Sequence, residues 1–217
     1  MNRDLRREHV EYEAGHLTED GAGPDPFELF SRWMEDAFVC QAEGTLEEPS
    51  AMVLSTVDVD GQPHSRVVLL KEATIAGFAF YTNYSSDKGV ELASNPRASL
   101  LFFWPVLQRQ IRIDGVTERL STDANDDYFA IRPRGSQLGA WASEQSRPIE
   151  SLAALRDRFA EVEAGYEGAS VPRPVEWGGY RLVPASFEFW QGQPNRLHDR
   201  IKYSRVADGW QRLRLNP

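Results

Sequence analysis

Residues 189–200, FWQGQPNRLHDR, place several chemically active side chains beside a turn. A glycine, a proline and an asparagine within the segment predict that a strand ends there. Arg196 offers a planar fork of donors for a phosphate or carboxylate, His198 titrates near neutral pH, and Arg200 adds a second fixed cation. The segment suits a small anionic substrate in a reaction that moves a proton, although a solvated hairpin would carry the same residues.

The composition favours one soluble domain. The 217 residues include 24 Lys and Arg against 33 Asp and Glu, for a formal net charge of −9. This charge opposes nucleic acid or an anionic membrane as a partner. The single cysteine, Cys40, falls on a predicted helix, where a packed structural thiol is expected. With no signal peptide, long apolar run or zinc-like Cys/His spacing, the sequence predicts a cytoplasmic protein without a metal site.

The chain is predicted to consist of an arm and one domain. Residues 1–24 are polar and contain glycines, which indicates a mobile arm able to fold over a site. Asp25, Pro26 and Glu28 are typical of the cap, the first position and the capping-box partner of a helix. Residues 25–217 are therefore predicted to form the single domain, which begins with this helix.

Most of the domain is predicted to be β-rich. Short alternating runs joined by tight turns fill residues 51–118. Helices are predicted at 86–94, 121–132 and 149–165, and later strands at 179–184, 187–191 and in a final hairpin. This β-rich α+β pattern implies an antiparallel sheet or barrel. A dinucleotide-binding βαβ unit would need long alternating helices and a G-x-G-x-x-G, and the sequence has neither.

Polar side chains border the predicted strands. Arg66 and Lys71 bracket the apolar run VVLL, and strand alternation would place them on opposite faces. A shared ligand therefore needs a bulge, a strand end or a ligand that reaches around the edge. Tyr81 and Thr82 end a strand, and Lys88 opens the next helix. Hydroxyls, a cation and the N–H groups of a helix start suit a phosphate, and they equally suit an ordinary helix cap beside a surface lysine.

A second polar group lies further along the chain. Tyr128 and Arg132 are four residues apart on a predicted helix, and Ser136 follows in the loop after it. A phenol, a guanidinium and a hydroxyl so close together favour a phosphate over a merely solvated helix end. Gln110 begins a strand, and its amide both donates and accepts, as contact with a heterocycle requires. Three more residues are explained equally well by a helix cap or by the core: Gln145, Ser146 and Trp190.

These segments, in this order, resemble the pyridoxine/pyridoxamine 5′-phosphate oxidase family from about Arg6 to Pro217. The resemblance is carried by RVVLLK, YTN, RQI, RPRGSQLGAWAS, EFWQG and RLHDR in register. It implies an antiparallel, Greek-key-like split β-barrel with flanking helices, in a homodimer with FMN at the subunit interface. It also implies oxidation of pyridoxamine or pyridoxine 5′-phosphate by O2 to pyridoxal 5′-phosphate, with H2O2 and, from the amine, ammonia, in vitamin B6 biosynthesis and salvage.

The resemblance also assigns roles by position. The residues implied to hold FMN are Arg66, Val67, Val68, Leu69, Leu70, Lys71, Tyr81, Thr82, Lys88, Gln110, Gln145, Ser146, Trp190 and Arg200. Those implied to grip the substrate phosphate are Lys71, Tyr128, Arg132 and Ser136, while Arg196, Leu197 and His198 flank the pyridine ring. Arg196 and His198 form the implied catalytic set, the first orienting the ring and the second assisting with the proton of the amine or alcohol.

Two positions depart from the family pattern. Asp87 stands where the family often has a basic residue beside Lys88, so it is left out of the site and is expected to face solvent or the helix N-terminus. His9 departs from an N-terminal R-R-E-Y, so a lid role for the arm rests on the matching Arg6 and Arg7.

Two alternative functions share this fold. A phenazine-biosynthesis-type flavin oxidase would act on a bulkier tricyclic substrate, and the implied phosphate-binding residues argue against it. A non-catalytic carrier of FMN or pyridoxal phosphate would bind without turnover, and Arg196 and His198 argue against that.

Overall fold

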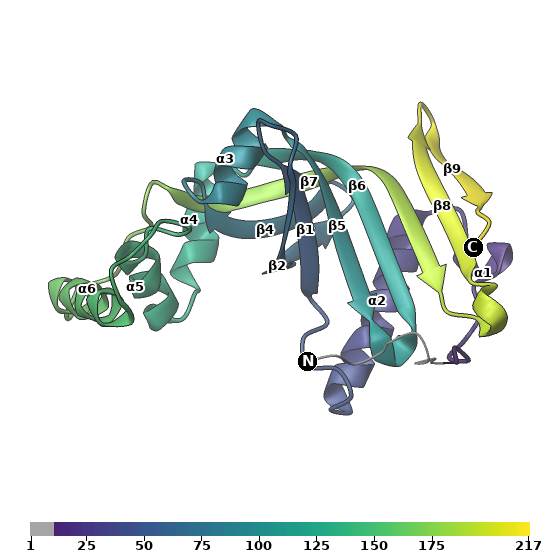
Figure 1. The fold of residues 1–217 in the computed structure, drawn as a ribbon, viewed down its shortest axis with the longest axis horizontal. Coiled ribbons are helices and arrows are strands. Elements are labelled where there is room, and N and C mark those ends of the chain that lie inside the picture. Colours follow the sequence, from purple (N-terminus) through teal and green to yellow (C-terminus); the bar gives the residue numbers. More distant parts are fainter. Residues whose placement is uncertain (1–10) are drawn as a thin grey trace, which may run out of the picture. The chain divides into compact units, whose positions relative to one another are not determined.

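The computed structural model describes residues 11–217 (Figure 1). In chain order its elements are α1 (Glu19–Ala22), α2 (Pro26–Ala42), β1 (Ala51–Val57), β2 (Pro63–Leu69), β3 (Glu72–Thr74), β4 (Gly77–Asn83), α3 (Asp87–Ser94), β5 (Arg97–Trp104), η2 (Pro105–Leu107), β6 (Arg109–Arg119), α4 (Thr122–Ala130), α5 (Arg134–Ala142), α6 (Leu152–Gly165), β7 (Trp177–Gln191), η3 (Pro194–Arg196), β8 (Asp199–Val206) and β9 (Gly209–Arg214). The strand order in the sheet is β2-β1-β5-β6-β7-β4-β3, and β8 pairs with both β7 and β9. Contacts within the chain define two compact units.

The first unit holds the described residues up to Val53, with Leu100–Asp114 and Pro184–Pro217. In it β8 pairs antiparallel with both β7 and β9, and Trp190 of β7 lies opposite Arg200 of β8. The chain between these two positions is therefore a turn whose two ends are fixed by strand pairing.

Helix α2 supplies part of the core of the first unit. It begins at Pro26 because the Asp25 side chain accepts a hydrogen bond from an N–H of the first turn and proline presets the helical backbone. Its Trp33 meets Phe189 of β7 edge-on, with 5.3 Å between ring centroids. Cys40 lies on the same helix as a buried free thiol.

The second unit holds Leu54–Ser99 and Gly115–Val183. Its strand β4 pairs antiparallel with the first half of β7, with Tyr81 opposite Gly179. Helices α4 and α5 and the start of β7 contribute to one buried cluster, which consists of Phe129, Leu138, Val171 and Trp177. Two side chains of α6, Phe159 and Val162, pack against this cluster.

Helix α5 was not predicted from the sequence. Residues 121–132 were expected as one helix followed by a loop, whereas α4 ends at Ala130 and a new helix starts at Arg134. Pro133 explains the break, because the residue before a proline avoids helical backbone. Glycines within α5 obscured it, since glycine is a weak helix former. Ser136 therefore lies on a helix, and Arg132 lies in the break between two helices rather than on α4.

Two other boundaries differ from expectation. The helix predicted from Ile149 begins at Leu152, because the Ser151 hydroxyl caps it by accepting a hydrogen bond from the N–H of Ala154. The strands predicted at 179–184 and 187–191 are parts of one continuous strand, β7.

Within residues 11–217, no helix is both long enough and apolar enough to cross a membrane. In the same part of the chain, no group of three His, Cys, Asp or Glu side chains is arranged to hold a metal ion.

Candidate active site

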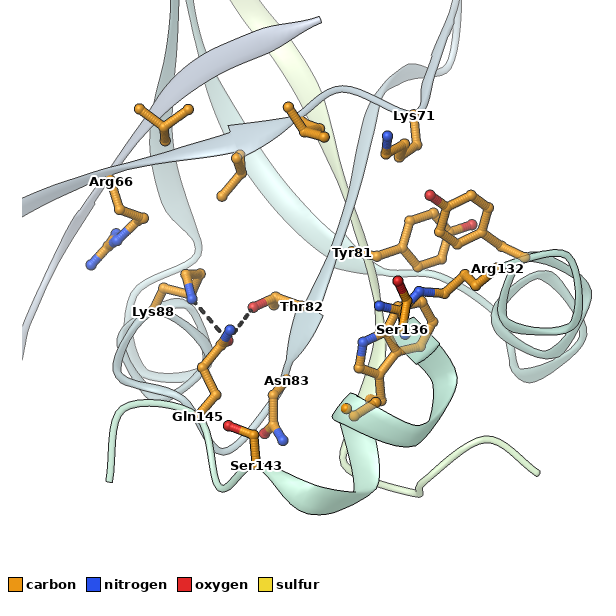
Figure 2. A pocket seen from close by; sticks show the side chains of 17 residues that line it. Arg66, Lys71, Tyr81, Thr82, Asn83, Lys88, Arg132, Ser136, Ser143 and Gln145 are labelled. Carbon is orange, nitrogen blue, oxygen red and sulfur yellow. Dashed lines mark hydrogen bonds between the residues drawn. The ribbon is translucent and has the colours of Figure 1, made fainter. Parts of the chain in front are cut away.

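The second unit contains a cleft of about 730 Å³ (Figure 2). Its walls come from β2, β4, α3, α4, α5 and β7, and from the segments that follow β2, α4 and α5. The lining residues that were predicted as site residues are Arg66, Val67, Val68, Leu69, Lys71, Tyr81, Thr82, Lys88, Tyr128, Arg132, Ser136 and Gln145. Residues brought together from such distant parts of the sequence indicate a binding site rather than a gap in packing.

Arg66 and Lys71 line the same cleft despite the alternation of strand residues. Strand β2 ends at Leu69, and Lys71 lies in the link to β3, where its backbone N–H donates to the carbonyl of Ala79 over 2.8 Å. The strand end anticipated from the sequence is therefore what allows both cations to line one cavity.

One end of the cleft holds two cations. Arg66 donates to the carboxylate of Glu91 over 2.9 Å and also contacts the Thr56 hydroxyl. Lys88 Nζ and the Thr82 hydroxyl each donate to Gln145 Oε1 over 3.0 Å (Figure 2). Burial lowers the pKa of Lys88, and the nearby charge of Arg66 lowers it further. A partly buried lysine beside a second cation marks a place where an anion would be stabilised.

The opposite end carries an aromatic wall with a guanidinium in it. Tyr81 stacks on Tyr128 at 4.0 Å and on Trp177 at 5.3 Å between ring centroids. The guanidinium of Arg132 lies over the Trp177 ring at 4.5 Å, and its Nη1 is buried with no hydrogen-bond partner among residues 11–217. Figure 2 shows Lys71 and Ser136 at this end as well. A buried, unpaired Arg donor is costly without a ligand, so this end fits a phosphate or carboxylate.

Charge is poorly solvated at this second end. Burial lowers the pKa of Arg132, the effect being partly opposed by Tyr128, and burial likewise raises the pKa of Tyr128. A partly desolvated cation binds an oxyanion more strongly than an exposed one, because less water screens the pair.

Other predicted site residues lie outside this cleft. Leu70 and Ser146 do not line it. Those in the first unit are Gln110, Trp190, Arg196, Leu197, His198 and Arg200. The cleft also includes residues that the sequence did not single out, namely Asn83, Gly139, Ala140, Ser143 and Trp177.

The turn between β7 and β8 carries Arg196 and His198. Asn195 and Arg196 have φ of 56° and 61°, a left-handed backbone that costs non-glycine residues about 1–3 kcal/mol each. His198 packs on Trp190 at 4.6 Å between ring centroids, and its Nδ1 accepts a hydrogen bond from the N–H of Gln193 over 3.1 Å. Burial lowers the pKa of His198, and the charge of Arg196 lowers it further. Both effects favour the neutral imidazole, and the hydrogen bond from Gln193 fixes its orientation.

Arg200 is tied to a buried carboxylate. Its Nε and Nη2 lie 2.8 and 2.7 Å from Glu188 Oε1, and Arg112 binds the other oxygen of Glu188 over 2.8 Å. The guanidinium of Arg200 thus has a rigid position in the first unit.

Two family models match the parts of the chain that carry the cleft and the turn between β7 and β8. Residues 40–165 match the model of the pyridoxamine 5′-phosphate oxidase family, and 177–217 match the C-terminal dimerisation region of pyridoxine 5′-phosphate oxidase. A curated relative from Rubrobacter xylanophilus, named pyridoxine/pyridoxamine 5′-phosphate oxidase, is 53% identical over 99% of this chain and 97% of its own. The chain belongs to the pyridoxine/pyridoxamine 5′-phosphate oxidase family.

Solved structures agree on the fold. PhzG from Burkholderia lata 383, described in complex with tetrahydrophenazine-1-carboxylic acid, has a TM-score of 0.85 and 34% identity, covering 93% of this chain and 98% of its own. An FMN-binding protein from Nostoc punctiforme, related to pyridoxamine 5′-phosphate oxidase, has a TM-score of 0.65 at 17% identity, covering 84% of this chain and 96% of its own. The predicted split-barrel class is confirmed. FMN is the cofactor of this oxidase family, and its matched dimerisation region indicates a homodimer.

Asp87, the departure from the oxidase family pattern, has a partner of its own. It lies in the first turn of α3, and its carboxylate binds Arg147 over 2.8 Å. Arg147 also donates to the carbonyl of Ser85 over 3.1 Å, so the carboxylate is paired rather than free to repel an anion. Asp87 does not line the cleft.

Tyr12 was missed in the sequence. His9, Arg6 and Arg7, on which the predicted lid rested, lie outside the described residues. Tyr12 meets His198 and Trp190 edge-on, at 5.5 and 5.7 Å between ring centroids. The chain after it is anchored because Glu13 and Ala14 donate backbone N–H bonds to the Gln108 side chain. One tyrosine in a polar arm gives no periodic signal, so only contact geometry identifies it.

Proposed function

We propose that this chain oxidises pyridoxamine 5′-phosphate and pyridoxine 5′-phosphate to pyridoxal 5′-phosphate with FMN and O2. For the amine, substrate, water and O2 give pyridoxal 5′-phosphate, ammonia and H2O2; for the alcohol, substrate and O2 give pyridoxal 5′-phosphate and H2O2. The observation that carries the proposal is one cleft with cations at two separate ends (Figure 2). Such a cleft suits two phosphorylated molecules bound together.

The end with Arg66 and Lys88 fits the phosphate of FMN. Besides the two cations it offers the start of α3, where the Ser86 hydroxyl donates to the Asn83 carbonyl instead of capping the helix. Gln145 and Thr82 would add polar contacts to the cofactor. When bound, FMN accepts the two electrons that leave C4′ of the substrate and passes them to O2.

The end with Arg132 fits the substrate phosphate. Arg132 would supply its unpaired Nη1, while Lys71 and Ser136 add a cation and a hydroxyl. Tyr128, stacked on Tyr81, closes the wall beside them. Fixing the phosphate at one point fixes the distance from C4′ to the cofactor, which is the main contribution that positioning makes to rate.

The turn with Arg196 and His198 would contact the pyridine ring. Arg196 orients the ring, and the neutral His198 offers its Nε2–H to the substituent at C4′. We further propose that FMN lies at the interface of the homodimer and that the N-terminal arm, residues 1–24, covers the substrate with Tyr12 against His198. The arm would exclude water from the reacting carbon.

A phenazine-type oxidase is the second candidate, because PhzG shares the fold at 34% identity. The end of the cleft around Arg132 would accept a carboxylate as well as a phosphate, so turnover of the phosphorylated substrates is what distinguishes the two candidates. A carrier without turnover would need neither Arg196 nor His198.

The test is turnover by the FMN-loaded protein. Pyridoxamine 5′-phosphate is added under air, and pyridoxal 5′-phosphate and H2O2 are measured together, with the flavin-free protein as control. We expect both products in equal amounts and only with FMN. Bound FMN without product from either phosphorylated substrate would refute the proposal and favour the phenazine-type oxidase or the carrier.

A further inference from the structure

Arg214, the last residue of β9, joins three separate segments of the first unit. Its Nε and Nη2 bind the two carboxylate oxygens of Glu19 over 2.6 and 3.0 Å, and Nη1 binds Asp199 Oδ1 over 2.7 Å. Nη2 also donates to the carbonyl of Leu17 over 2.9 Å. All three guanidinium nitrogens thus donate hydrogen bonds, in a pattern that the point charge of a lysine cannot reproduce.

Asp199 connects Arg214 to the turn between β7 and β8 through hydrogen bonds. Its second oxygen, Oδ2, accepts the backbone N–H of Leu17 and the side-chain amide of Gln193, each over 3.0 Å. The same amide of Gln193 donates to the carbonyl of Gly15. Asp199 is only 18% exposed, and Gln193 is buried, so water competes little with these bonds.

Gln193 is hydrogen-bonded both to Asp199 and to the imidazole of His198. Its backbone N–H donates to His198 Nδ1 over 3.1 Å, and the turn between the two residues contains the left-handed Asn195 and Arg196. Strained backbone persists only where surrounding contacts fix it, and the hydrogen bonds of Gln193 to Asp199 and His198 are such contacts, beside the rings of Trp190 and Tyr12.

We propose that Arg214 is a positioning residue for the active site, holding Asp199 so that Gln193 and the strained turn present Arg196 and His198 in the geometry for turnover. The inference rests on the proposed function, because Arg196 and His198 are the residues proposed to meet the substrate ring. The pKa of Glu19, lowered to about 2 chiefly by its hydrogen bond from Arg214, is consistent with a closely held contact.

Arg212 provides a matched control on the same strand. It also reaches the N-terminal segment, donating to the carbonyls of Glu19 and Gly23 over 2.6 and 2.7 Å, and the structure records no contact from it to Asp199. Arg214→Gln and Arg212→Gln therefore both remove an arginine that ties β9 to this segment. Only the first removes the support of the turn.

The experiment measures kcat, KM and FMN affinity for both variants and for Asp199→Asn, with pyridoxamine 5′-phosphate as substrate. We expect Arg214→Gln and Asp199→Asn each to lower kcat by between about 10-fold and 100-fold, since a displacement near 1 Å costs about that much. FMN affinity should change no more than in Arg212→Gln. The variant that combines Arg214→Gln with Asp199→Asn should have a kcat no lower than that of the slower single variant, because both changes remove the same contact. Equal kcat for the Gln variants of Arg214 and Arg212, or additive losses in the double variant, would overturn the proposal.

Hydrogen exchange separates this inference from the proposed function. Amides of residues 192–198 should exchange faster in Arg214→Gln than in Arg212→Gln, whether or not the protein turns over. If the wild type is inactive but this difference is seen, the proposed function fails while Arg214 still holds the turn. If the wild type is active and exchange in the turn is the same in both variants, the positioning role fails. Should Arg214→Gln not fold, Asp199→Asn provides the same comparison from the other side of the contact.

Discussion

The backbone N–H of Gln193 donates a hydrogen bond to Nδ1 of His198 over 3.1 Å. An imidazole nitrogen that accepts a hydrogen bond carries no proton, so the neutral ring bears its proton on Nε2. His198 is therefore arranged to donate a hydrogen bond through Nε2 and not to take a proton there. Its assistance at C4′ is that of a positioned donor.

The first prediction concerns pH. As pH falls, a proton on Nδ1 of His198 would break the bond from Gln193, and kcat/KM should fall with it. Because burial and Arg196 lower the pKa of His198, this decline should lie below the ordinary value of 6.5. Arg196→Met removes the charge that lowers the pKa of His198, so the midpoint of the decline in kcat/KM should move to higher pH. The rate itself should be lower at every pH. A midpoint that stays in place or moves down would contradict the assignment, and His198→Asn should abolish the decline.

The second prediction concerns the substrate phosphate. Arg132→Lys removes the planar donor set over Trp177 and should raise KM for pyridoxamine 5′-phosphate by about 10- to 100-fold, the loss expected for a hydrogen bond to a charged group. FMN affinity should stay as in the wild type. Pyridoxamine without its phosphate serves as the control substrate, and its slow turnover should change little. An equal loss with both substrates would place Arg132 elsewhere in the mechanism.

The third prediction concerns the cofactor phosphate. Lys88→Met removes one cation from the end of the cleft that holds Arg66, and the dissociation constant of FMN should rise by about 10- to 100-fold. Riboflavin, which has no phosphate, should bind both proteins equally, as followed by quenching of flavin fluorescence. Arg97→Met removes an exposed cation from the same unit and should leave both affinities unchanged. If FMN and riboflavin lose affinity together, Lys88 does not contact the phosphate.

The fourth prediction concerns the packing that places β7 beside the cleft. A Cβ on Gly178 would lie 2.2 Å from the hydroxyl of Tyr84 and 2.8 Å from the amide of Asn125. Asn125 holds the N–H of Gly179 over 2.8 Å, so neither neighbour can move freely. Gly178→Ala should lower the free energy of unfolding in urea by about 1–3 kcal/mol. Gly165→Ala, at a helix position with open space, should change it by less than about 1 kcal/mol. Similar changes in the free energy of unfolding for the two variants would contradict this prediction, because they would show that Tyr84 and Asn125 move aside for the new methyl group.

Local sequence signals were sufficient for much of this fold. The start of α2 at Pro26 followed from cap residues, and the strands from alternation and turns. The cleft residues Arg66, Lys88 and Arg132 were singled out because charged side chains at predicted strand and helix ends suit an anion, although an ordinary helix end would carry the same residue types.

What the sequence could not supply depends on tertiary contacts. Helix α5 contains two glycines and starts after a proline, so its intrinsic helix propensity is weak. The helix forms because its Leu138 is buried against Phe129 and Trp177. Trp177 itself looks like any core aromatic until its stacking on Tyr81 is seen. Tyr12 is held by contacts with His198 and Trp190, which lie at the other end of the sequence, and no local pattern encodes such contacts.

The most direct test of the proposed oxidation is reduction of the bound cofactor by the proposed substrate. The FMN-loaded protein is mixed with pyridoxamine 5′-phosphate in the absence of O2, and the visible absorbance of oxidised flavin is followed together with pyridoxal 5′-phosphate. We predict that the absorbance is lost and that one pyridoxal 5′-phosphate forms per flavin. Flavin that remains oxidised while bound, with no aldehyde formed, would contradict the account.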